Sequence, residues 1–248
     1  MNKALLVLVL VLIGCLVGLA QPADKKAVDI KLVVDPAADA AALVMAKAAQ
    51  VAHGGDKFKA VRSMVSKGSV DMNVMGQAVP GAFSIAYSGE KYFFDLVTPA
   101  QQLKQVFDGN STYTSLQGFY MPPAASVGFP VLSHVGDKGY VVSAIPDPKK
   151  RSKGFRVLTP DGYYTDFFID EKTKVVKSYE SSYDMGQGRL VTTSVSLDEF
   201  ETIDGVLAPK KFSQLFDLGT ITAYVTFKAK TIQINSKIED SAFTLPGN

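Results

Sequence analysis

Cysteine is almost absent from this sequence of 248 residues, in which Cys15 is the only one. A single thiol cannot form an intramolecular disulfide, and it cannot build a cysteine-based zinc site, which needs several ligands at fixed spacing. The fold must therefore be stabilised by its hydrophobic core. The chain is long enough to bury a sizeable one.

Histidine is scarce too, and the residue combinations typical of enzymes are missing. His53 stands before Gly54-Gly55 at the expected end of a helix, where we expect a solvent-exposed side chain that interacts with the helix dipole. His134 falls in an expected loop without a cluster of cysteines or carboxylates at ligand spacing, so we expect no metal ion. The sequence has no G-x-S-x-G, H-E-x-x-H, Walker A or G-x-G-x-x-G motif, and we expect neither an enzyme nor a cofactor.

The chain also lacks a large excess of charge of either sign, because 26 Lys and Arg residues nearly balance 24 Asp and Glu residues. The basic residues are scattered rather than clustered, so nothing points to a nucleic-acid partner. Linkers rich in Pro, Gly or Ser are absent as well. Residues 35–248 are therefore predicted to form a single domain.

The long apolar run of this sequence lies at the N-terminus. A short basic start at residues 1–3 (MNK) precedes apolar residues 4–17, and residues 18–20 (GLA) offer a small-x-small cleavage site before polar Gln21. This pattern predicts a secretory signal peptide over residues 1–20 and hence an exported, periplasmic protein. The run is shorter than the about 20 residues that a transmembrane helix needs.

Residues 12–15 (LIGC) leave an alternative open. They resemble a bacterial lipobox, in which Cys15 would be lipidated and the protein would be a membrane-anchored lipoprotein. Against lipidation, the apolar residues 16–20 would then follow the anchor, where a polar tether is expected. We favour cleavage after Ala20, with residues 21–34 as a tether ahead of the domain.

A helix is predicted from Asp35, which suits the N-cap, to about Ala52, with Pro36 at its first position. Gly54-Gly55 should end it. One stripe of this helix is expected to dock on a sheet, and the many alanines should permit a close approach. Asp56 is expected to cap a second short helix. The docking stripe is predicted to consist of Leu43, Val44, Lys47, Ala48 and Val51.

From Met64 onward the apolar period changes from 3.6 residues to two, which is the period of β-strands. Asp-Gly turns recur at 108–109, 161–162 and 204–205, and no long crossover helix interrupts the run. The pattern predicts a mainly β (α+β) protein built on an antiparallel meander of about ten or eleven strands. So many strands in one sheet should curl strongly or close.

The clearest strands lie within residues 190–234, where turns at 204–205 and 218–219 separate three long apolar-alternating segments. The third segment is expected to have one wet and one apolar face. The predicted apolar face holds Ile221, Ala223, Val225, Phe227 and Ala229.

Residues 117–131 break this alternation, since they are apolar, interrupted by Pro122-Pro123 and without a clean period. Two interpretations stay open. The segment is either a loop packed on the core or a flap over the apolar face of the sheet, as long apolar loops often are. Its large side chains are Phe119, Tyr120, Met121 and Phe129.

Several short motifs recur in a recognisable order. They are AAQVAHGG at 48–55 with Phe58 and Val61, FDGN at 107–110, FID at 168–170 with Thr173, FETIDGVLAP at 200–209, and Ile234-Asn235 leading to Phe243 and Pro246. Together they resemble the periplasmic lipoprotein-carrier (LolA-like) superfamily of outer-membrane lipoprotein-sorting proteins. The resemblance implies a sheet rolled into a half-open barrel, with one or two N-terminal helices in the concavity and an apolar ligand cavity between them. The arginine with which dedicated carriers of this family latch their lid helices has no counterpart that we can match here.

The resemblance and the strand pattern together predict a hydrophobic site. We expect an exported, monomeric protein that carries or holds a lipid or a lipoprotein acyl chain. In the alternative, the sheet packs fully on its helices and serves as a non-catalytic interaction or sensor domain for an envelope protein. The predicted wall of the site is Val70, Met72, Val74, Phe83, Ile85, Tyr87, Val225 and Phe227, and the predicted flap is Phe119, Tyr120, Met121 and Phe129.

Overall fold

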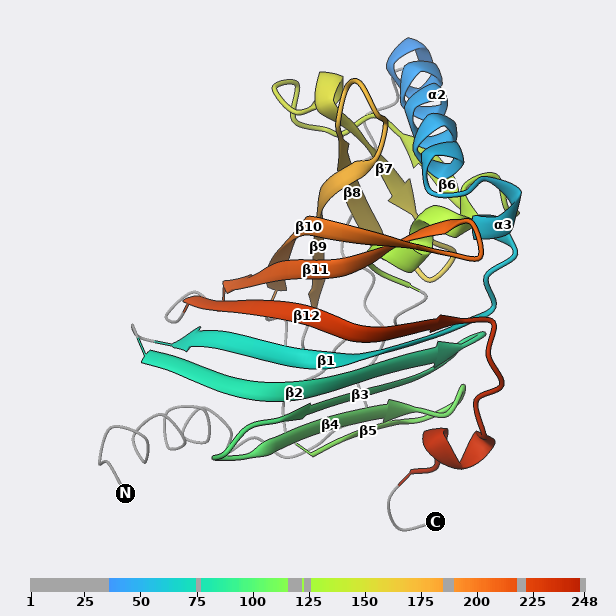
Figure 1. Ribbon diagram of the computed structural model, residues 1–248. Helices are drawn as coiled ribbons and strands as arrows, with labels where there is room; N and C mark the ends of the chain where they lie inside the picture. Colours follow the sequence, from blue (N-terminus) through green and yellow to red (C-terminus); the bar gives the residue numbers. More distant parts are fainter. Residues whose placement is uncertain are drawn as a thin grey trace.

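A single twelve-stranded antiparallel sheet dominates the computed structural model, which describes residues 36–74, 77–115, 122, 126–184, 190–217 and 222–245 (Figure 1). The predicted curved antiparallel meander is confirmed, with twelve strands instead of ten or eleven. The strands are β1 (Ser63–Val74), β2 (Gln77–Ser88), β3 (Lys91–Val97), β4 (Gln102–Phe107), β5 (Thr112–Thr114), β6 (Val141–Ser143), β7 (Gly154–Leu158), β8 (Tyr164–Ile169), β9 (Val176–Asp184), β10 (Leu190–Ile203), β11 (Val206–Asp217) and β12 (Thr222–Ile234).

The helical elements are few and short. The main helix is α2 (Pro36–Ala52), followed by the single turn α3 (Asp56–Lys59). The described residues also form three 3-10 helices: η1 (Phe129–His134), η2 (Arg151–Lys153) and η3 (Asp240–Phe243). In the part of the chain that the structure describes, no helix is both long and apolar enough to cross a membrane.

The sheet order is β5-β4-β3-β2-β1-β12-β11-β10-β9-β8-β7-β6, so the first and the last strand lie side by side near its middle. Their pairing runs from Met64 opposite Ile234 to Asn73 opposite Tyr224. The two short strands β5 and β6 are the edges, and the sheet is not closed into a barrel. It bends instead, with β1–β5 and β12 running across the view of Figure 1 and β7 and β8 standing upright.

Local side-chain chemistry explains several of the recurring motifs. Asp204 and Gly205 both have positive φ values, of 51° and 84°, as the tight hairpin between β10 and β11 requires. Asp108 accepts the backbone N–H groups of Asn110 and Ser111 at 2.8 Å each, and these bonds lower the pKa of its carboxyl group. These residues are thus turn formers rather than catalytic groups.

Asn235, just after β12, also uses its side chain to bond backbone groups. Its side-chain oxygen accepts the N–H of Arg62 at 2.7 Å, and its amide nitrogen donates to the carbonyl of Ala60 at 3.2 Å. The end of β12 is thereby tied to the connection between α3 and β1.

The predicted docking face of α2 is wrong. The residues that pack on β6, β7 and η1 are Ala42, Ala46 and Ala49, all 0% exposed, whereas Val44 and Val51 are 69% and 71% exposed. Hydrophobicity pointed to the larger side chains, but three alanines bring the helix backbone closer to the sheet. Two polar residues on the alanine side, Gln50 and His53, also find buried hydrogen-bond partners there.

His53 is buried, not solvent-exposed as predicted, with 0% of its surface accessible. Its Nδ1–H donates to the carbonyl of Leu207 at 2.8 Å, and its Nε2 accepts the N–H of Val176 at 3.1 Å. This pair of bonds requires the neutral ring, and burial lowers the pKa of His53 accordingly. The backbone carbonyl of His53 also accepts the N–H of Leu207 at 3.0 Å.

Gly54 follows at a point where the helix end touches the hairpin between β10 and β11. Its φ is 123°, and a Cβ atom there would lie 2.6 Å from the carbonyl oxygen of Gly205. The His-Gly-Gly motif thus provides a buried hydrogen-bonding ring and then a residue without a side chain at a close backbone contact.

The buried apolar residues form two clusters. The first, which we call the helix-covered core, lies between β6–β11 and the helices α2, α3 and η1; it includes Ala46, Phe58, Phe129, Leu132, Phe155, Val157, Phe167 and Val195. The second, which we call the strand cluster, has Val70, Phe83, Val225, Phe227 and Ala229 at its centre, with Met72, Ile85, Phe94, Leu96, Phe212 and Ile232 partly buried around them.

Several predicted features lie outside the described residues. They are the signal peptide at 1–20 with Cys15, the tether at 21–34, the N-cap Asp35, the turn at 218–219 and the flap residues Phe119, Tyr120 and Met121.

Candidate functional site

Six of the predicted wall residues meet in the strand cluster: Val70, Met72, Phe83, Ile85, Val225 and Phe227. The register of the central strands brings them together, since Val70 lies opposite Phe227 and Met72 opposite Val225. Directly opposed residues of antiparallel strands point to the same face. The predicted apolar and wet faces of β12 are confirmed for its described side chains, because Val225, Phe227 and Ala229 are buried while Tyr224, Lys228 and Lys230 are exposed.

Aromatic rings form the centre of the strand cluster. Phe83 and Phe227 meet edge-to-face with their centroids 5.2 Å apart, and Phe212 stacks on Phe227 at 4.8 Å. Such contacts contribute beyond the apolar area that they bury.

The predicted wall lacks five members of the strand cluster: Phe94, Leu96, Phe212, Ala229 and Ile232. Of these, Ala229 was expected on the apolar face of its strand but not in the wall, and a signal was available for two more. The strand at 91–97 alternates, and pairing it with β2 places Phe94 opposite Ile85 and Leu96 opposite Phe83. The alternation alone did not reveal them, because the register that aligns two strands is a tertiary property.

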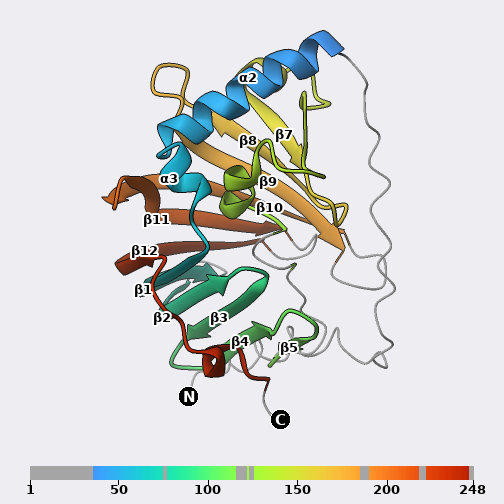
Figure 2. The ribbon, with the colours of Figure 1, turned by 90° about the vertical axis from the view of Figure 1, so that its right-hand side faces the viewer.

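The exposure of this surface changes from its centre to its rim. Val70, Phe83 and Phe227 are at most 3% exposed, while Met72 and Ile85 among the surrounding side chains are only partly buried. The main contacts of α2 and α3 are with β6, β7 and η1, and with β11, whose Phe212 belongs to both clusters (Figure 2). Among the described helices only η3 contacts β3 substantially. The strand cluster therefore presents apolar surface that neither α2 nor α3 packs on.

Two other predicted site residues belong to the helix-covered core. Tyr87 packs against that core, and burial raises the pKa of its phenol group to about 12. Phe129 lies 5.0 Å from His53 and 5.4 Å from Phe58, measured between ring centroids. The structure thus places Phe129 under the helices. Val74 ends β1, and its side chain lies outside the described residues.

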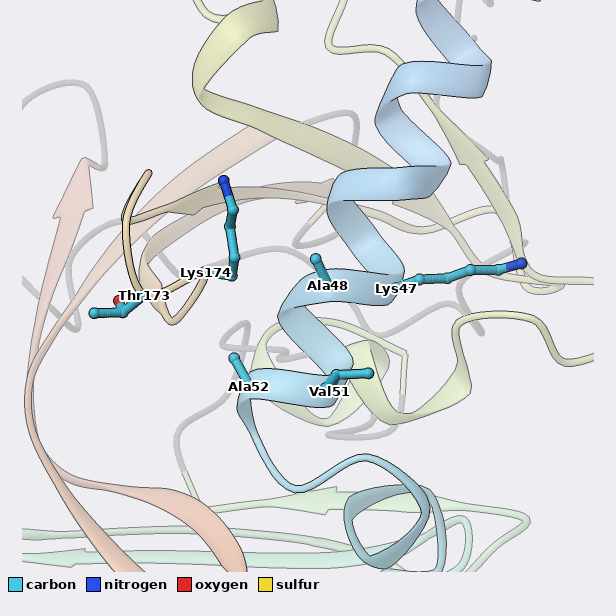
Figure 3. A pocket seen from close by; sticks show the side chains of 6 residues that line it. All are labelled: Lys47, Ala48, Val51, Ala52, Thr173 and Lys174. Carbon is cyan, nitrogen blue, oxygen red and sulfur yellow. The ribbon is translucent and has the colours of Figure 1, made fainter.

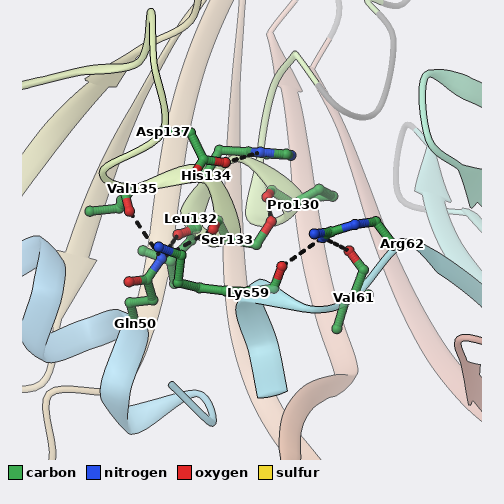
Figure 4. Close-up of polar contacts among 10 residues, drawn as sticks. All are labelled: Gln50, Lys59, Val61, Arg62, Pro130, Leu132, Ser133, His134, Val135 and Asp137. Atoms are coloured by element: carbon green, nitrogen blue, oxygen red, sulfur yellow. Dashed lines mark hydrogen bonds and ion pairs between the residues drawn. The ribbon is translucent and has the colours of Figure 1, made fainter. Parts of the chain in front are cut away.

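The segment that contains Phe129 is fixed by polar contacts. Gln50 Nε2 lies 3.1–3.3 Å from the carbonyl oxygens of Leu132, Ser133 and Val135, at the end of η1 (Figure 4). At the other end, the N–H of Gly128 donates to Thr165 Oγ1 at 3.0 Å. For residues 126–131 the packed-loop interpretation holds.

Two pockets lined by described residues are shallow and lie away from the strand cluster. The larger, of about 410 Å³, lies between the outer side of α2 and the turn after β8, where Ala48 and Ala52 face Thr173 and Lys174 (Figure 3). The smaller, of about 200 Å³, lies between α3 and the hairpin of β10 and β11. Both are open surface depressions.

One charged pair of the sheet is nearly buried. Arg156 makes a two-pronged ion pair with Asp166 at 2.6 and 2.8 Å and stacks on Tyr164 at 3.8 Å. Arg156 lies between Phe155 and Val157 in β7, so its side chain points away from the helix-covered core. It does not latch a helix. Within the described residues, no group of three or more His, Cys, Asp or Glu side chains is placed to hold a metal ion.

Comparisons with known proteins give similarities of fold. A scan against models of protein families finds no match, and a search of curated protein sequences finds none. Among solved structures, a DUF1329 family protein from Desulfovibrio piger matches with a TM-score of 0.48 and 12% identity over 85% of this chain and 98% of that one.

A LolA superfamily protein from Nitrosomonas europaea matches with a TM-score of 0.49 and 13% identity, over 79% of this chain and 97% of that one. An outer-membrane lipoprotein-sorting protein domain from Vibrio parahaemolyticus, described as putative, matches with a TM-score of 0.42 and 9% identity, over 83% and 97%.

Proposed function

We propose that this chain is an exported protein that binds a hydrophobic ligand, the acyl chain of a lipid or of a lipoprotein, on the strand cluster. The observation that carries the proposal is the exposure pattern of that cluster. Partly buried apolar side chains surround a buried aromatic centre, and α2 and α3 pack on the other half of the sheet. An acyl chain laid on this surface would remove the exposed rim from water.

The driving force for such binding is apolar burial. Each buried CH₂ group contributes about 0.8 kcal/mol, so a chain of about fourteen carbons contributes on the order of 10 kcal/mol before ordering costs are subtracted. The strand cluster spans five neighbouring strands, from β3 through β2, β1 and β12 to β11. With strands about 4.8 Å apart, this surface is about 19 Å wide, which suits an extended chain.

Titration of the delipidated protein with a fluorescent acyl ester tests the proposal. We expect Met72→Gln and Ile85→Gln to weaken binding about tenfold each, because each change replaces apolar surface that would contact the acyl chain with a polar amide. Val97→Gln is the matched control, since Val97 is exposed on β3 and points to the opposite face from Leu96. Protein that binds no acyl probe at all would refute the proposal.

Export is tested separately on protein taken from its native host. Mass spectrometry of the intact chain should find Gln21 as the first residue, as signal cleavage after Ala20 predicts. A chain that begins at a lipidated Cys15 would assign the membrane-anchored alternative instead. The same spectrum reports any lipid that copurifies with the protein.

A second candidate function, an interaction domain for an envelope protein, is supported by the outer face of α2. Val44 and Val51 are mostly exposed there, next to the shallow pocket at Ala48 and Ala52. A photo-crosslinker at position 44 should then capture an envelope protein, while one at position 97 should not. Capture at both positions or at neither would count against this candidate.

A further inference from the structure

A row of polar side chains crosses the face of the sheet that carries both clusters, which we call the inner face. Thr165 of β8 lies opposite Ser181 of β9, and Ser181 lies opposite Thr193 of β10. All three are at most 5% exposed, and the hydroxyl groups of Thr165 and Ser181 are 3.1 Å apart. Each lies two positions along its strand from a residue of the helix-covered core or packed against it, so the three share its face. Those neighbours are Phe167, Tyr179 and Val195.

The row ends at Gln214 in β11, which is only partly buried. Its Nε2–H donates to Thr193 Oγ1 at 2.8 Å. Its Oε1 atom has no hydrogen-bond partner in the described part of the chain, and it is open to solvent, since no side-chain atom of Gln214 is both buried and unpaired. One end of this amide is thus fixed by the protein, while the other end is an available acceptor.

The register places Gln214 at the junction of the two clusters. It lies directly opposite Val195 of the helix-covered core and directly opposite Val225 of the strand cluster. Phe212, two residues before it in β11, packs against both clusters. The side chain of Gln214 therefore shares the inner face with the strand cluster and borders that cluster on the side of the helix-covered core.

A ligand on the strand cluster meets this acceptor at one end. The cluster extends from β11 across β12, β1 and β2 to β3, so a chain laid across these strands has one end beside Gln214 and the other beside β3. An amide oxygen only accepts hydrogen bonds. It therefore favours a ligand group with an N–H or O–H over an ester or a carboxylate, whose oxygens are acceptors as well.

We propose that Gln214 determines which head group the site accepts, because its Oε1 accepts a hydrogen bond from a polar hydrogen at the head of the acyl chain, an amide N–H or a hydroxyl. This inference rests on the proposed function and specifies the ligand chemistry. The bond from Nε2 to Thr193 holds the amide in place before a ligand arrives, which reduces the ordering cost of binding.

The binding test uses two pyrene-labelled probes with acyl chains of equal length, an N-methyl fatty amide and a fatty acid methyl ester. Only the amide has a hydrogen to donate. The ratio of amide to ester affinity is measured in the wild type and in Gln214→Met, whose side chain has a similar length and no amide. We expect this ratio to fall about fivefold in Gln214→Met. A general loss of stability would leave the ratio unchanged, because both probes are measured on the same protein.

Gln102→Met is the matched control. Gln102 of β4 lies opposite Val97, on the other face of the sheet, and its Nε2–H donates to Asp95 at 2.7 Å. The same substitution there also removes one side-chain hydrogen bond, but it should leave the ratio of affinities as in the wild type. Competition by an N-acylated peptide and by a monoacylglycerol then tells whether an amide N–H or a hydroxyl is the better donor.

The outcomes separate this inference from the proposed function. The same ratio in the wild type and in Gln214→Met, or an equal fall in Gln102→Met, overturns the role of Gln214 and leaves the hydrophobic site intact. A wild-type preference for the ester that Gln214→Met loses also overturns it, because the amide nitrogen would then face the ligand. Binding of neither probe by the wild type refutes the proposed function itself.

Discussion

The helix-covered core and the strand cluster occupy the two halves of one sheet, and they differ in what lies on their apolar face. Over β6–β10 the face is filled by helix α2 with its alanines, by α3 and by η1. Over β1–β3 and β12 it is filled mainly by aromatic and aliphatic side chains of the strands themselves. The same alternation of apolar and polar residues therefore produces a helix-covered core in one half and an apolar surface that α2 does not pack on in the other.

Buried polar bonds hold the helical cover on the sheet. His53 bonds to both β9 and β11, and Gln50 bonds to the end of η1. Lifting α2 from the sheet would leave these groups unpaired in an apolar environment, which is costly. The strand cluster has no such bonds to a helix among its described residues. Exchange of an apolar guest is therefore expected in that half alone.

The largest difference between the halves is expected from removing one aromatic ring in each. Phe155→Ala in β7 should lower the free energy of unfolding by about 4 kcal/mol, because this ring is fully buried. Phe94→Ala in β3 should cost only about 1–2 kcal/mol, since the ring is partly exposed. Urea denaturation measures both values. Equal losses would mean that the strand cluster is packed as tightly as the helix-covered core.

A smaller loss is expected at the close contact between α2 and the hairpin of β10 and β11. Gly54→Ala should cost about 3 kcal/mol, because its φ of 123° is unsuited to a side chain and the Cβ would meet the Gly205 carbonyl. Gly89→Ala is the control, at a turn with φ of 57° and nothing within 4 Å, and should cost about 1 kcal/mol. Similar melting temperatures for the two variants would contradict the close contact.

His53→Ala should lower the free energy of unfolding by about 2–3 kcal/mol at neutral pH. The change leaves the N–H of Val176 and the carbonyl of Leu207 without their partner in a buried site. His134→Ala, at a partly exposed hydrogen bond with Asp137, should change the urea midpoint little. If the His53 variant were as stable as the His134 variant, the hydrogen bonds of His53 would not be what holds α2 on the sheet.

The effect of pH should reveal the neutral state of His53. Burial lowers its pKa below the value of 6.5 expected in the unfolded chain, so the unfolded chain binds the extra proton first as pH falls. The stabilising contribution is full above pH 6.5 and is lost as pH falls below it, with a slope of at most about 1.4 kcal/mol per pH unit. The stability of the wild type should therefore approach that of His53→Ala between pH 7 and 5. A constant gap between the two would contradict this.

The smallest effect is expected at the contact between η3 and β3. Lys91 pairs with Asp240 at 2.8 Å, and both side chains are more than a third exposed. Lys91→Ala should leave the urea midpoint unchanged within error, because such pairs are screened by water and salt. A clear loss of stability would show that η3 supports the strand half as firmly as α2 supports the other half.

Prediction from the sequence succeeded where local chemistry decides the outcome. The helix at residues 36–52, the Asp-Gly hairpin at 204–205 and the apolar face of β12 were all expected and are present. It failed for the docking face of α2 and for the exposure of His53. Both depend on partners that are distant in the chain, such as Leu207, which is 154 residues from His53, and no local pattern reveals such partners.

The candidate site was predicted in part for the same reason. Alternation placed Val70, Met72, Phe83 and Ile85 on one face, and the structure gathers them. Phe94 and Phe212 joined them only through the pairing of β2 with β3 and of β11 with β12. Phe129, which the sequence left either in a packed loop or in a flap, lies under the helices, because Gln50 and Thr165 hold its segment there.

The sequence by itself determined which residues form strands, where the turns fall and which side of each strand is apolar, since these depend on backbone preferences and on neighbours along the chain. Only the tertiary structure decided that β1 pairs with β12, that alanines rather than valines dock α2, and that the two halves of the sheet are covered differently. These outcomes depend on strand register, on how closely backbones can approach and on buried hydrogen bonds between distant residues. Such terms arise only when the chain is folded.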